Sequence, residues 1–274
     1  MTIGVIIEKK EKSMSIGIFD SGVGGLTVLK EIRKVLPNEK IYYLGDTARV
    51  PYGEKTKELI VRYSKQITEF LLEQNVDAIV VACNTATSLA LEELKETFRV
   101  PIIGVVDAGV KTALYTTKNN KIGVIGTKAT INSRKYETEI KNKNSKIEVY
   151  SKSCPLFVPV IEEGITKGEI VDLVVKMYLD EFKEKIDSLI LGCTHYPLLK
   201  ETIKNLYPNI EIVDPAKETA EDLKKILTDN NLMKNDGEKG KEVRYYVTDG
   251  QEKFKEIGTM FLDENIDYVE LIKL

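Results

Sequence analysis

Histidine is almost absent: His195 is the single histidine among 274 residues. A metal site built on several histidines is therefore excluded. A Ser-His-Asp hydrolase would have to use His195, and no Gly-x-Ser-x-Gly turn is present to carry its serine. The three cysteines are odd in number and lack Cys-x-x-Cys spacing. This argues against a zinc site and a disulfide framework, and it indicates a reducing compartment.

An excess of charge of one sign is also lacking. The 40 basic and 43 acidic residues leave a net charge of -3, so no overall field attracts nucleic acid or an anionic membrane. No run of 18 apolar residues occurs that could span a bilayer. We expect a cytoplasmic protein without nucleic-acid or membrane partners. Residues 1–14 lack the features of a secretory signal, and we interpret them as a dispensable extension, with Met14 as an alternative start.

Short apolar runs rich in β-branched residues alternate with amphipathic segments, which predicts an α/β fold with mostly parallel sheets. The predicted strands are Ser15–Asp20, Lys40–Asp46, Ala78–Asn84, Pro101–Asp107, Lys121–Thr127, Lys146–Ser151, Ser188–Thr194, Ile210–Asp214 and Val243–Thr248. The predicted helices are Gly25–Leu36, Lys57–Gln74, Thr87–Phe98, Glu169–Lys185, Pro197–Leu206, Glu218–Asp229 and Gln251–Leu262. The polar segment Asn230–Glu242 is predicted to be a loop.

An internal repeat divides the chain. The segment Val76–Thr87 resembles Ile186–Pro197: each is an apolar strand, then a cysteine, a polar pair and a helix. The earlier segments IGIFDSG and IGVIGTK, and the later segments VVD and IVD, recur in the same order at nearly the same offset. We predict two similar α/β lobes related by pseudo-two-fold symmetry, with the active site in the cleft between them. The first lobe comprises residues 15–107 and 217–274, and the second comprises residues 108–216.

Two cysteines, Cys83 and Cys193, end equivalent strands of the repeat, where open parallel sheets bind ligands. A helix follows each, and a helix N-terminus favours a thiolate. Two thiols that face one small substrate suit racemisation, in which one removes the α-proton and the other delivers a proton to the opposite face. A cysteine at a buried strand end is more often a core residue. The repeat argues against that reading for this pair, whereas Cys154 has no repeat partner and is predicted to pack in the core.

The glycine-rich segment Asp20–Leu26 follows the first strand and opens a helix. Its backbone could hold a carboxylate or a phosphate at the helix N-terminus. It matches neither Gly-x-Gly-x-x-Gly nor a P-loop, which weakens the nucleotide-binding alternative. Asp20 and Ser21 could contact a substrate ammonium, or Asp20 could be only a helix cap. His195, two residues after Cys193, could assist proton transfer at that thiol.

With these motifs the chain resembles the glutamate racemases of the aspartate/glutamate racemase superfamily from about Ser15 to its C-terminus. The motifs that carry the resemblance are FDSGVGGL (Phe19–Leu26), LGDTARVPYG (Leu44–Gly53), VACNTAT (Val81–Thr87), IGTKATI (Ile125–Ile131), CPLFVPVIEEG (Cys154–Gly164) and LGCTHYPLL (Leu191–Leu199). The longer N-terminus is the main difference.

The resemblance implies roles for single residues. Cys83 takes the proton from the D-enantiomer and Cys193 from the L-enantiomer, with Asp20 and His195 as auxiliary acid–base groups. The implied substrate-binding residues are Ser21, Asn84, Thr85 and Thr194 for the ammonium and α-carboxylate, and Tyr52, Gly53, Thr127 and Thr130 for the side-chain carboxylate. Asp46 and Glu162 are implied as carboxylates of lesser role. Gly53 as a simple turn residue and Asp46 as a strand-end cap stay open as alternatives.

The resemblance also implies a cofactor-independent enzyme, with no pyridoxal phosphate, metal or flavin. It implies a homodimer in the bacterial cytoplasm that supplies D-glutamate for peptidoglycan, and hence for cell-wall biogenesis and cell shape. The alternatives are a racemase of another amino acid such as aspartate, a two-lobe protein that binds a small anion without chemistry, and a nucleotide-binding regulator.

Overall fold

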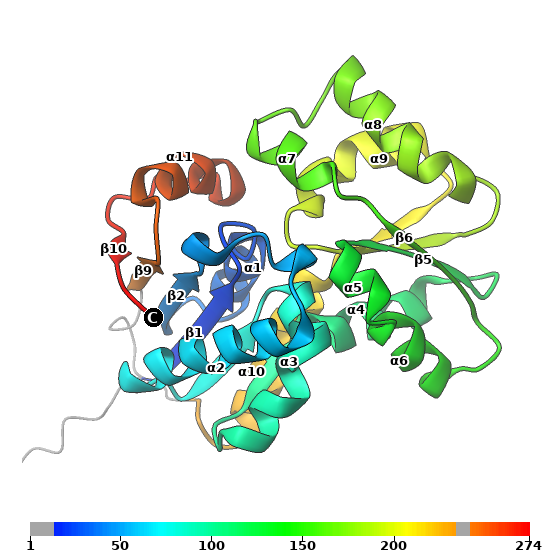
Figure 1. Cartoon of the computed structure of the whole chain (residues 1–274). Coiled ribbons are helices and arrows are strands. Elements are labelled where there is room, and N and C mark those ends of the chain that lie inside the picture. Colours follow the sequence, from blue (N-terminus) through cyan, green and yellow to red (C-terminus); the bar gives the residue numbers. More distant parts are fainter. Residues whose placement is uncertain (1–13, 234–241) are drawn as a thin grey trace, which may run out of the picture.

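A computed structural model of the chain describes residues 14–233 and 242–274. The predicted extension, apart from Met14, and most of the predicted loop Asn230–Glu242 lie outside the described residues. The described chain is an α/β protein with two parallel sheets, each flanked by helices (Figure 1). No helix in these two ranges is both long enough and apolar enough to cross a membrane.

The two sheets share a run of four strands in the same order. The first runs β10-β9-β2-β1-β3-β4 and the second runs β6-β5-β7-β8, with every neighbouring pair parallel. The strands are β1 (Ser15–Asp20), β2 (Lys40–Gly45), β3 (Ala78–Val81), β4 (Ile102–Gly104), β5 (Lys121–Gly126), β6 (Glu148–Ser153), β7 (Ser188–Gly192), β8 (Glu211–Val213), β9 (Val243–Val247) and β10 (Glu270–Leu271). The run β2-β1-β3-β4 in the first sheet corresponds to β6-β5-β7-β8 in the second, as the repeat predicts.

Helices cover both faces of the sheets. They are α1 (Leu26–Val35), α2 (Lys57–Glu73), α3 (Asn84–Thr97), α4 (Val105–Thr116), α5 (Lys128–Asn132), α6 (Lys135–Lys143), α7 (Phe157–Glu162), α8 (Glu169–Leu179), α9 (Lys200–Leu206), α10 (Pro215–Asp229) and α11 (Gln251–Leu262). Ile16 and Ile18 of β1 join one hydrophobic core, and Phe19 joins another. Strands buried on both faces are continuous apolar runs, which is why they were readable from the sequence.

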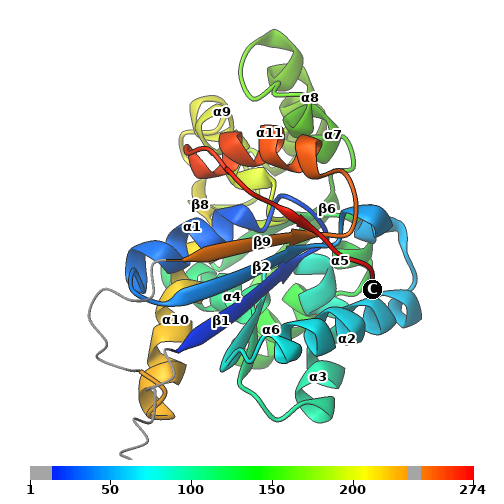
Figure 2. The ribbon, with the colours of Figure 1, turned by 90° about the vertical axis from the view of Figure 1, so that its left-hand side faces the viewer.

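The C-terminal segment returns to the first lobe, because β9 pairs with β2 and β10 with β9 (Figure 2). Helix α10 packs against both α1 and α4 and so connects the lobes. We propose the division into residues 15–107 with 217–274 and residues 108–216 on the basis of this sheet membership. The first boundary lies within α4, so a helix links the lobes there.

Several predicted elements need correction. The strand predicted over Pro101–Asp107 ends at Gly104, and α4 begins at Val105, so Asp107 lies in a helix. Val105 and Val106 at the start of α4 favour a strand by residue type, yet both are buried where this helix packs against the second sheet. Helix α10 begins at Pro215, three residues early, because Asp214 caps it by accepting the amide of Ala216 at 3.0 Å.

Other helices were missed or had different bounds. The helix α4 was not predicted, and α3 begins at Asn84, which was predicted to end the preceding strand. Helices α5, α6 and α7 were not predicted; they have 5, 9 and 6 residues, too few for a clear period. The helix predicted over Glu169–Lys185 ends at Leu179 and continues as a 3₁₀ turn. The helix predicted over Pro197–Leu206 starts as a 3₁₀ turn, Tyr196–Leu199, before α9.

Candidate active site

A cavity of about 350 Å³ lies at the carboxyl ends of β1, β3, β5 and β7, where the lobes face each other. This volume is at the small end of the roughly 300–1,000 Å³ typical of ligand sites. The first lobe contributes Ser21, Gly22, Val50, Pro51, Tyr52, Gly53, Cys83, Asn84 and Thr85, and the second contributes Thr127, Val158, Pro159, Glu162, Glu163, Gly192, Cys193, Thr194 and His195.

The Cys83 thiol is held at a helix start. β3 ends at Val81 and α3 begins at Asn84, which makes Cys83 the N-cap. Its Sγ accepts the amide N–H of Ala86 at 3.5 Å, and the residue is 5% exposed. The prediction that Cys83 lies at a strand end, immediately before a helix, is confirmed.

The Cys193 thiol follows β7 and lines the same cavity from the other lobe. It does not cap an α-helix as predicted, because its carbonyl accepts the amide of Tyr196 in a 3₁₀ turn that precedes α9. Its Sγ lies 4.0 Å from Nδ1 of His195. Both thiols are buried, so the cavity presents one sulfur from each lobe to the same small volume.

The prediction that a thiolate is favoured at both cysteines is wrong, because burial favours the neutral thiol. Burial and, after it, the nearby Asp20 raise the pKa of Cys83 to about 12, although the amide of Ala86 lowers it in part. Burial also raises the pKa of Cys193, with the amide of His195 opposing this. One helix start does not offset full desolvation of the sulfur. Each thiol is therefore neutral near pH 7, and a neighbouring base must take its proton before it can act as a base.

Stability should fall as the pH rises above about 8.5, the ordinary pKa of a thiol. Above that pH the unfolded thiols lose their protons, whereas Cys83 keeps its proton until about 12 and burial likewise raises the pKa of Cys154 and Cys193. The free energy of unfolding should drop by about 1.4 kcal/mol per pH unit for each thiol. Denaturant unfolding between pH 7 and 10.5 measures the slope, and Cys154→Ala should reduce it by one thiol. A stability that stays constant to pH 10 would contradict this.

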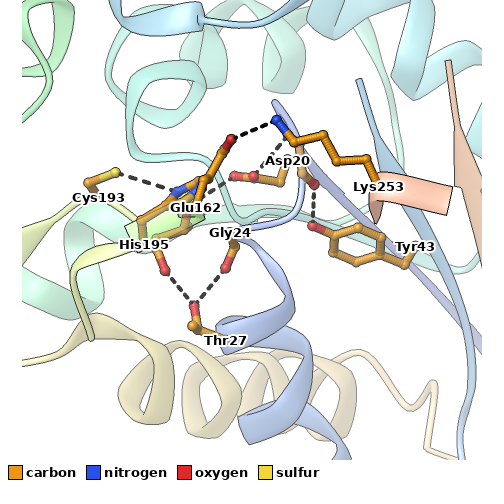
Figure 3. A network of polar contacts seen from close by, with 10 residues as sticks. Asp20, Gly24, Thr27, Tyr43, Glu162, Cys193, His195 and Lys253 are labelled. Carbon is orange, nitrogen blue, oxygen red and sulfur yellow. Dashed lines mark hydrogen bonds and ion pairs between the residues drawn. The ribbon is translucent and has the colours of Figure 1, made fainter. Parts of the chain in front are cut away.

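His195 lies beside the Cys193 thiol, with Asp20 nearby (Figure 3), and Asp20 also acts electrostatically on Cys83. Asp20 Oδ2 accepts the amide of Gly22 at 3.0 Å, and the hydroxyl of Thr194 lies 3.4 Å from Oδ1. Burial raises the pKa of Asp20, which His195 partly opposes. Nε2 of His195 lies 3.2 Å from Oε1 of Glu162, which itself lines the cavity. The site thus contains two candidate proton carriers beside its two thiols.

Most of the implied substrate-binding residues line the cavity. Those that do are Ser21, Tyr52, Gly53, Asn84, Thr85, Thr127 and Thr194. Thr130 lies one layer behind, where three hydroxyls form a triangle: Thr85 with Thr127 at 2.9 Å, Thr85 with Thr130 at 3.1 Å, and Thr127 with Thr130 at 3.0 Å. The triangle joins α3 of the first lobe to α5 of the second and orients the Thr85 and Thr127 hydroxyls.

Gly53 is more than a turn residue. A Cβ atom there would lie 2.6 Å from the Cβ of Thr127 in the opposite lobe, so any side chain would push the lobes apart. The missing side chain lets the segment after β2 close one wall of the cavity. This contact requires glycine for close approach rather than for an unusual backbone angle.

Asp46 does not line the cavity. Its buried carboxylate accepts from Arg49 Nε at 2.7 Å, from the hydroxyl of Thr248 at 2.9 Å, and from the hydroxyl of Tyr52. These contacts hold the segment that carries Tyr52 against the end of β9. The arrangement favours an anchoring role over the auxiliary catalytic role implied by the resemblance.

Asp46→Asn should therefore destabilise the fold more than it slows the reaction. Loss of the charge leaves Arg49, whose side chain is 17% exposed, without its carboxylate, at a cost of roughly 2–4 kcal/mol. The turnover of folded protein at low temperature should fall less than tenfold. Thermal unfolding and turnover, measured side by side, distinguish the two roles. Unchanged stability with turnover lost by a hundredfold would restore the catalytic assignment.

Sequence reasoning missed several residues of the site. The wall of the cavity around Glu162 also contains Val158, Pro159 and Glu163. They belong to the same motif as Glu162, which alone was predicted from it as a site residue. Tyr136 on α6 was missed entirely, although its hydroxyl donates to Oδ1 of Asn84 at 2.6 Å. Within residues 14–233 and 242–274, no group of three or more His, Cys, Asp or Glu side chains is arranged to hold a metal ion.

The two α/β lobes each bring a buried cysteine to one cavity of a size that suits a small molecule. The family model described as Asp/Glu/Hydantoin racemase matches residues 17–223, and the chain belongs to this family. It is an amino-acid racemase, an isomerase.

Sequence and structure comparisons agree. The chain is 52% identical over 264 residues to the glutamate racemase of Persephonella marina, covering 95% of this chain and 99% of that protein. It is 51% identical over 254 residues to the glutamate racemase of Aquifex aeolicus, covering 93% and 96%. The crystal structure of the Francisella tularensis glutamate racemase in complex with D-glutamate matches with a TM-score of 0.89 at 44% identity, covering 95% of this chain and 98% of that one.

Proposed function

We propose that the protein interconverts L- and D-glutamate by a two-base mechanism, without a cofactor. The observation that carries this proposal is the pair of buried thiols, Cys83 and Cys193, which reach one small cavity from opposite lobes. The names of the relatives support glutamate as the substrate. A single catalytic base would return the proton to the same face, whereas two opposed bases invert the configuration.

The neutral thiols define the order of proton transfers. For L-glutamate, Nδ1 of His195 takes the proton of Cys193, and the thiolate then removes the α-proton. The Cys83 thiol gives its proton to the opposite face of the carbanion and becomes a thiolate. For D-glutamate the roles reverse, and Asp20 serves as the proton acceptor for Cys83, whose pKa its charge already influences. After turnover of L-glutamate, Cys193 is a thiol again, His195 carries one additional proton and Cys83 lacks one. Release of the His195 proton to solvent and uptake of one proton by Cys83 restore the starting state.

The site offers groups that stabilise a carbanion-like transition state. The lining of the cavity is mostly apolar, so hydrogen bonds and charges inside it act more strongly than in water. The Thr85 and Thr127 hydroxyls, oriented by their mutual hydrogen bonds, and the Asn84 amide, held by Tyr136, are preorganised donors. We further propose a cytoplasmic homodimer that supplies D-glutamate for peptidoglycan, which the resemblance to glutamate racemases supports.

Two measurements test the reaction. Circular dichroism of L-glutamate should decay to zero with catalytic amounts of protein, and in D₂O the α-proton of glutamate should be replaced by deuterium. The rate should persist after treatment with a chelator, in protein purified without pyridoxal phosphate. A protein that binds glutamate without exchange would contradict the proposal, as would activity that disappears with the chelator.

Glutamate should be preferred over aspartate by about a hundredfold in kcat/KM. The wall formed by Tyr52, Gly53 and Thr127 would hold the side-chain carboxylate, and one missing methylene would misplace Cα between the thiols. Misplacement by about 1 Å can cost on the order of a hundredfold in rate. Racemisation of L-aspartate beside L-glutamate measures the ratio. Comparable rates would refute this selectivity and leave racemisation itself intact.

A further inference from the structure

Helix α11 belongs to the first lobe by chain connection, yet two of its side chains reach the catalytic side of the second lobe. It follows β9 of the first sheet and lies on the side of that sheet that faces α7 (Figures 1 and 2). Nζ of Lys253 lies 3.5 Å from Oε2 of Glu162. The Phe261 ring packs edge-on against the His195 ring, with centroids 5.3 Å apart and planes at 85°.

Glu162 connects α11 to the histidine. It is the last residue of α7, and its two oxygens have different partners: Oε1 lies 3.2 Å from Nε2 of His195, and Oε2 faces Lys253 (Figure 3). The His195 hydrogen bond lowers the pKa of Glu162 most, and Lys253 lowers it further. Glu162 is therefore a carboxylate, and it acts as an acceptor toward both neighbours.

This contact determines where the ring proton of His195 lies. A carboxylate at Nε2 favours the tautomer with the proton on Nε2. The lone pair of Nδ1 then faces Sγ of Cys193 at 4.0 Å. A histidine held this way can accept the thiol proton, and Glu162 stabilises the imidazolium that forms.

We propose that Lys253 is a positioning residue for proton transfer at Cys193: it holds Glu162 across the lobe interface, so that Glu162 holds His195. This inference rests on the proposed racemase function. Lys253 does not line the cavity of the thiols and touches no reacting atom. Its side chain is 69% exposed and the ion pair is long, so the pair contributes little to stability. The consequence of its loss appears in catalysis.

Overall racemisation alone cannot detect which thiol is affected. Because L- and D-glutamate have equal free energies, kcat/KM must be equal in the two directions for every variant. Elimination from an analogue with a leaving group at Cβ is free of this constraint, since it needs only one proton abstraction. Elimination from the L-analogue reports on Cys193, and elimination from the D-analogue reports on Cys83.

The experiment compares Lys253→Met with Lys255→Met, which removes the same charge from the same helix. Among the described residues, Lys255 forms an ion pair with Glu252 alone. Lys253→Met should lower racemisation and elimination from the L-analogue by about two- to fivefold, the range for one exposed ion pair, and leave elimination from the D-analogue unchanged. Lys253→Arg should restore the rate, and Lys255→Met should match the wild type. In a Glu162→Gln background, Lys253→Met should cost nothing further, since the two act through one contact.

The outcomes separate the two proposals. Wild-type protein that leaves the α-proton of glutamate unexchanged would overturn the racemase function, and this inference with it. An active wild type with equal rates for Lys253→Met and Lys255→Met would overturn the inference alone. So would an equal loss with both analogues, failure of Lys253→Arg to restore the rate, or an undiminished effect in the Glu162→Gln background, since each indicates a general structural effect.

Discussion

Replacing either Cys83 or Cys193 by alanine is expected to lower glutamate racemisation by a factor of about 10²–10⁴. In the proposed mechanism each thiol is needed in both directions, since it takes a proton in one and gives a proton in the other. The two residues are alone in bringing sulfur to the cavity among the described residues that line it. Racemisation followed by circular dichroism, at equal concentrations of folded protein, measures the loss.

The two variants should differ in what they retain. Cys83→Ala keeps the base for the L-enantiomer, and Cys193→Ala keeps the base for the D-enantiomer. With an analogue that eliminates a leaving group from Cβ, Cys83→Ala should process only the L-form and Cys193→Ala only the D-form. The two-base cleft is wrong if both variants process the same enantiomer, or if either one racemises glutamate at the wild-type rate.

Cys154→Ala is the matched control for this pair. Cys154 is fully buried in the hydrophobic core beside Phe157, away from the cavity lining, as the absence of a repeat partner predicted. Its loss should cost stability, about 1 kcal/mol, and leave turnover unchanged. A large loss of activity in this variant would mean that removal of any buried thiol disturbs the site.

The elements that were predictable from the sequence are those whose signal is local. β1 (Ser15–Asp20) and α11 (Gln251–Leu262) have the predicted bounds, because both are apolar segments with clear period and abrupt polar ends. The segment α4 carries no such signal. Its first residues, Val105 and Val106, are of a type that favours β-strands. Packing against the second sheet outweighs this preference, and the segment is a helix.

The same distinction applies to the site. The repeat placed Cys83 and Cys193 on equivalent strand ends, and parallel sheets bring such ends to one edge. The contacts of Tyr136 with Asn84 and of Lys253 with Glu162 join residues 52 and 91 positions apart. Such contacts depend on how the lobes and α11 pack, which neither period nor composition encodes.

The charge state of the thiols was mispredicted for a physical reason. A helix start is visible in the sequence, so its favourable dipole could be inferred at Cys83. The desolvation that outweighs it depends on complete burial by both lobes, together with the Asp20 carboxylate from another strand. The pKa of a thiol between two lobes depends on the assembled structure, because each lobe alone would leave its thiol exposed to water.

Gly24→Ala is expected to reduce racemase activity strongly, although Gly24 has no side chain that could take part in the reaction. A Cβ atom there would lie 2.4 Å from Nδ1 of His195 and 2.4 Å from the Oγ1 of Thr194, closer than packed atoms allow. Nδ1 is the atom that faces Cys193, and Thr194 is hydrogen-bonded to Asp20. The methyl must therefore displace an auxiliary proton carrier or separate the lobes.

The expected loss in kcat/KM is on the order of a hundredfold, since about 1 Å of displacement at a catalytic group costs that much. Stability should fall by roughly 1–3 kcal/mol, the usual cost of overpacking. Gly22→Ala is the control in the same loop: its Cβ would meet only Val50 at 3.5 Å, an ordinary contact, so the free energy of unfolding should stay within about 0.5 kcal/mol. Thermal unfolding and circular dichroism of L-glutamate measure both quantities. Turnover within threefold of the wild type for Gly24→Ala would show that His195 can move without consequence, and its role in proton transfer at Cys193 would then fail.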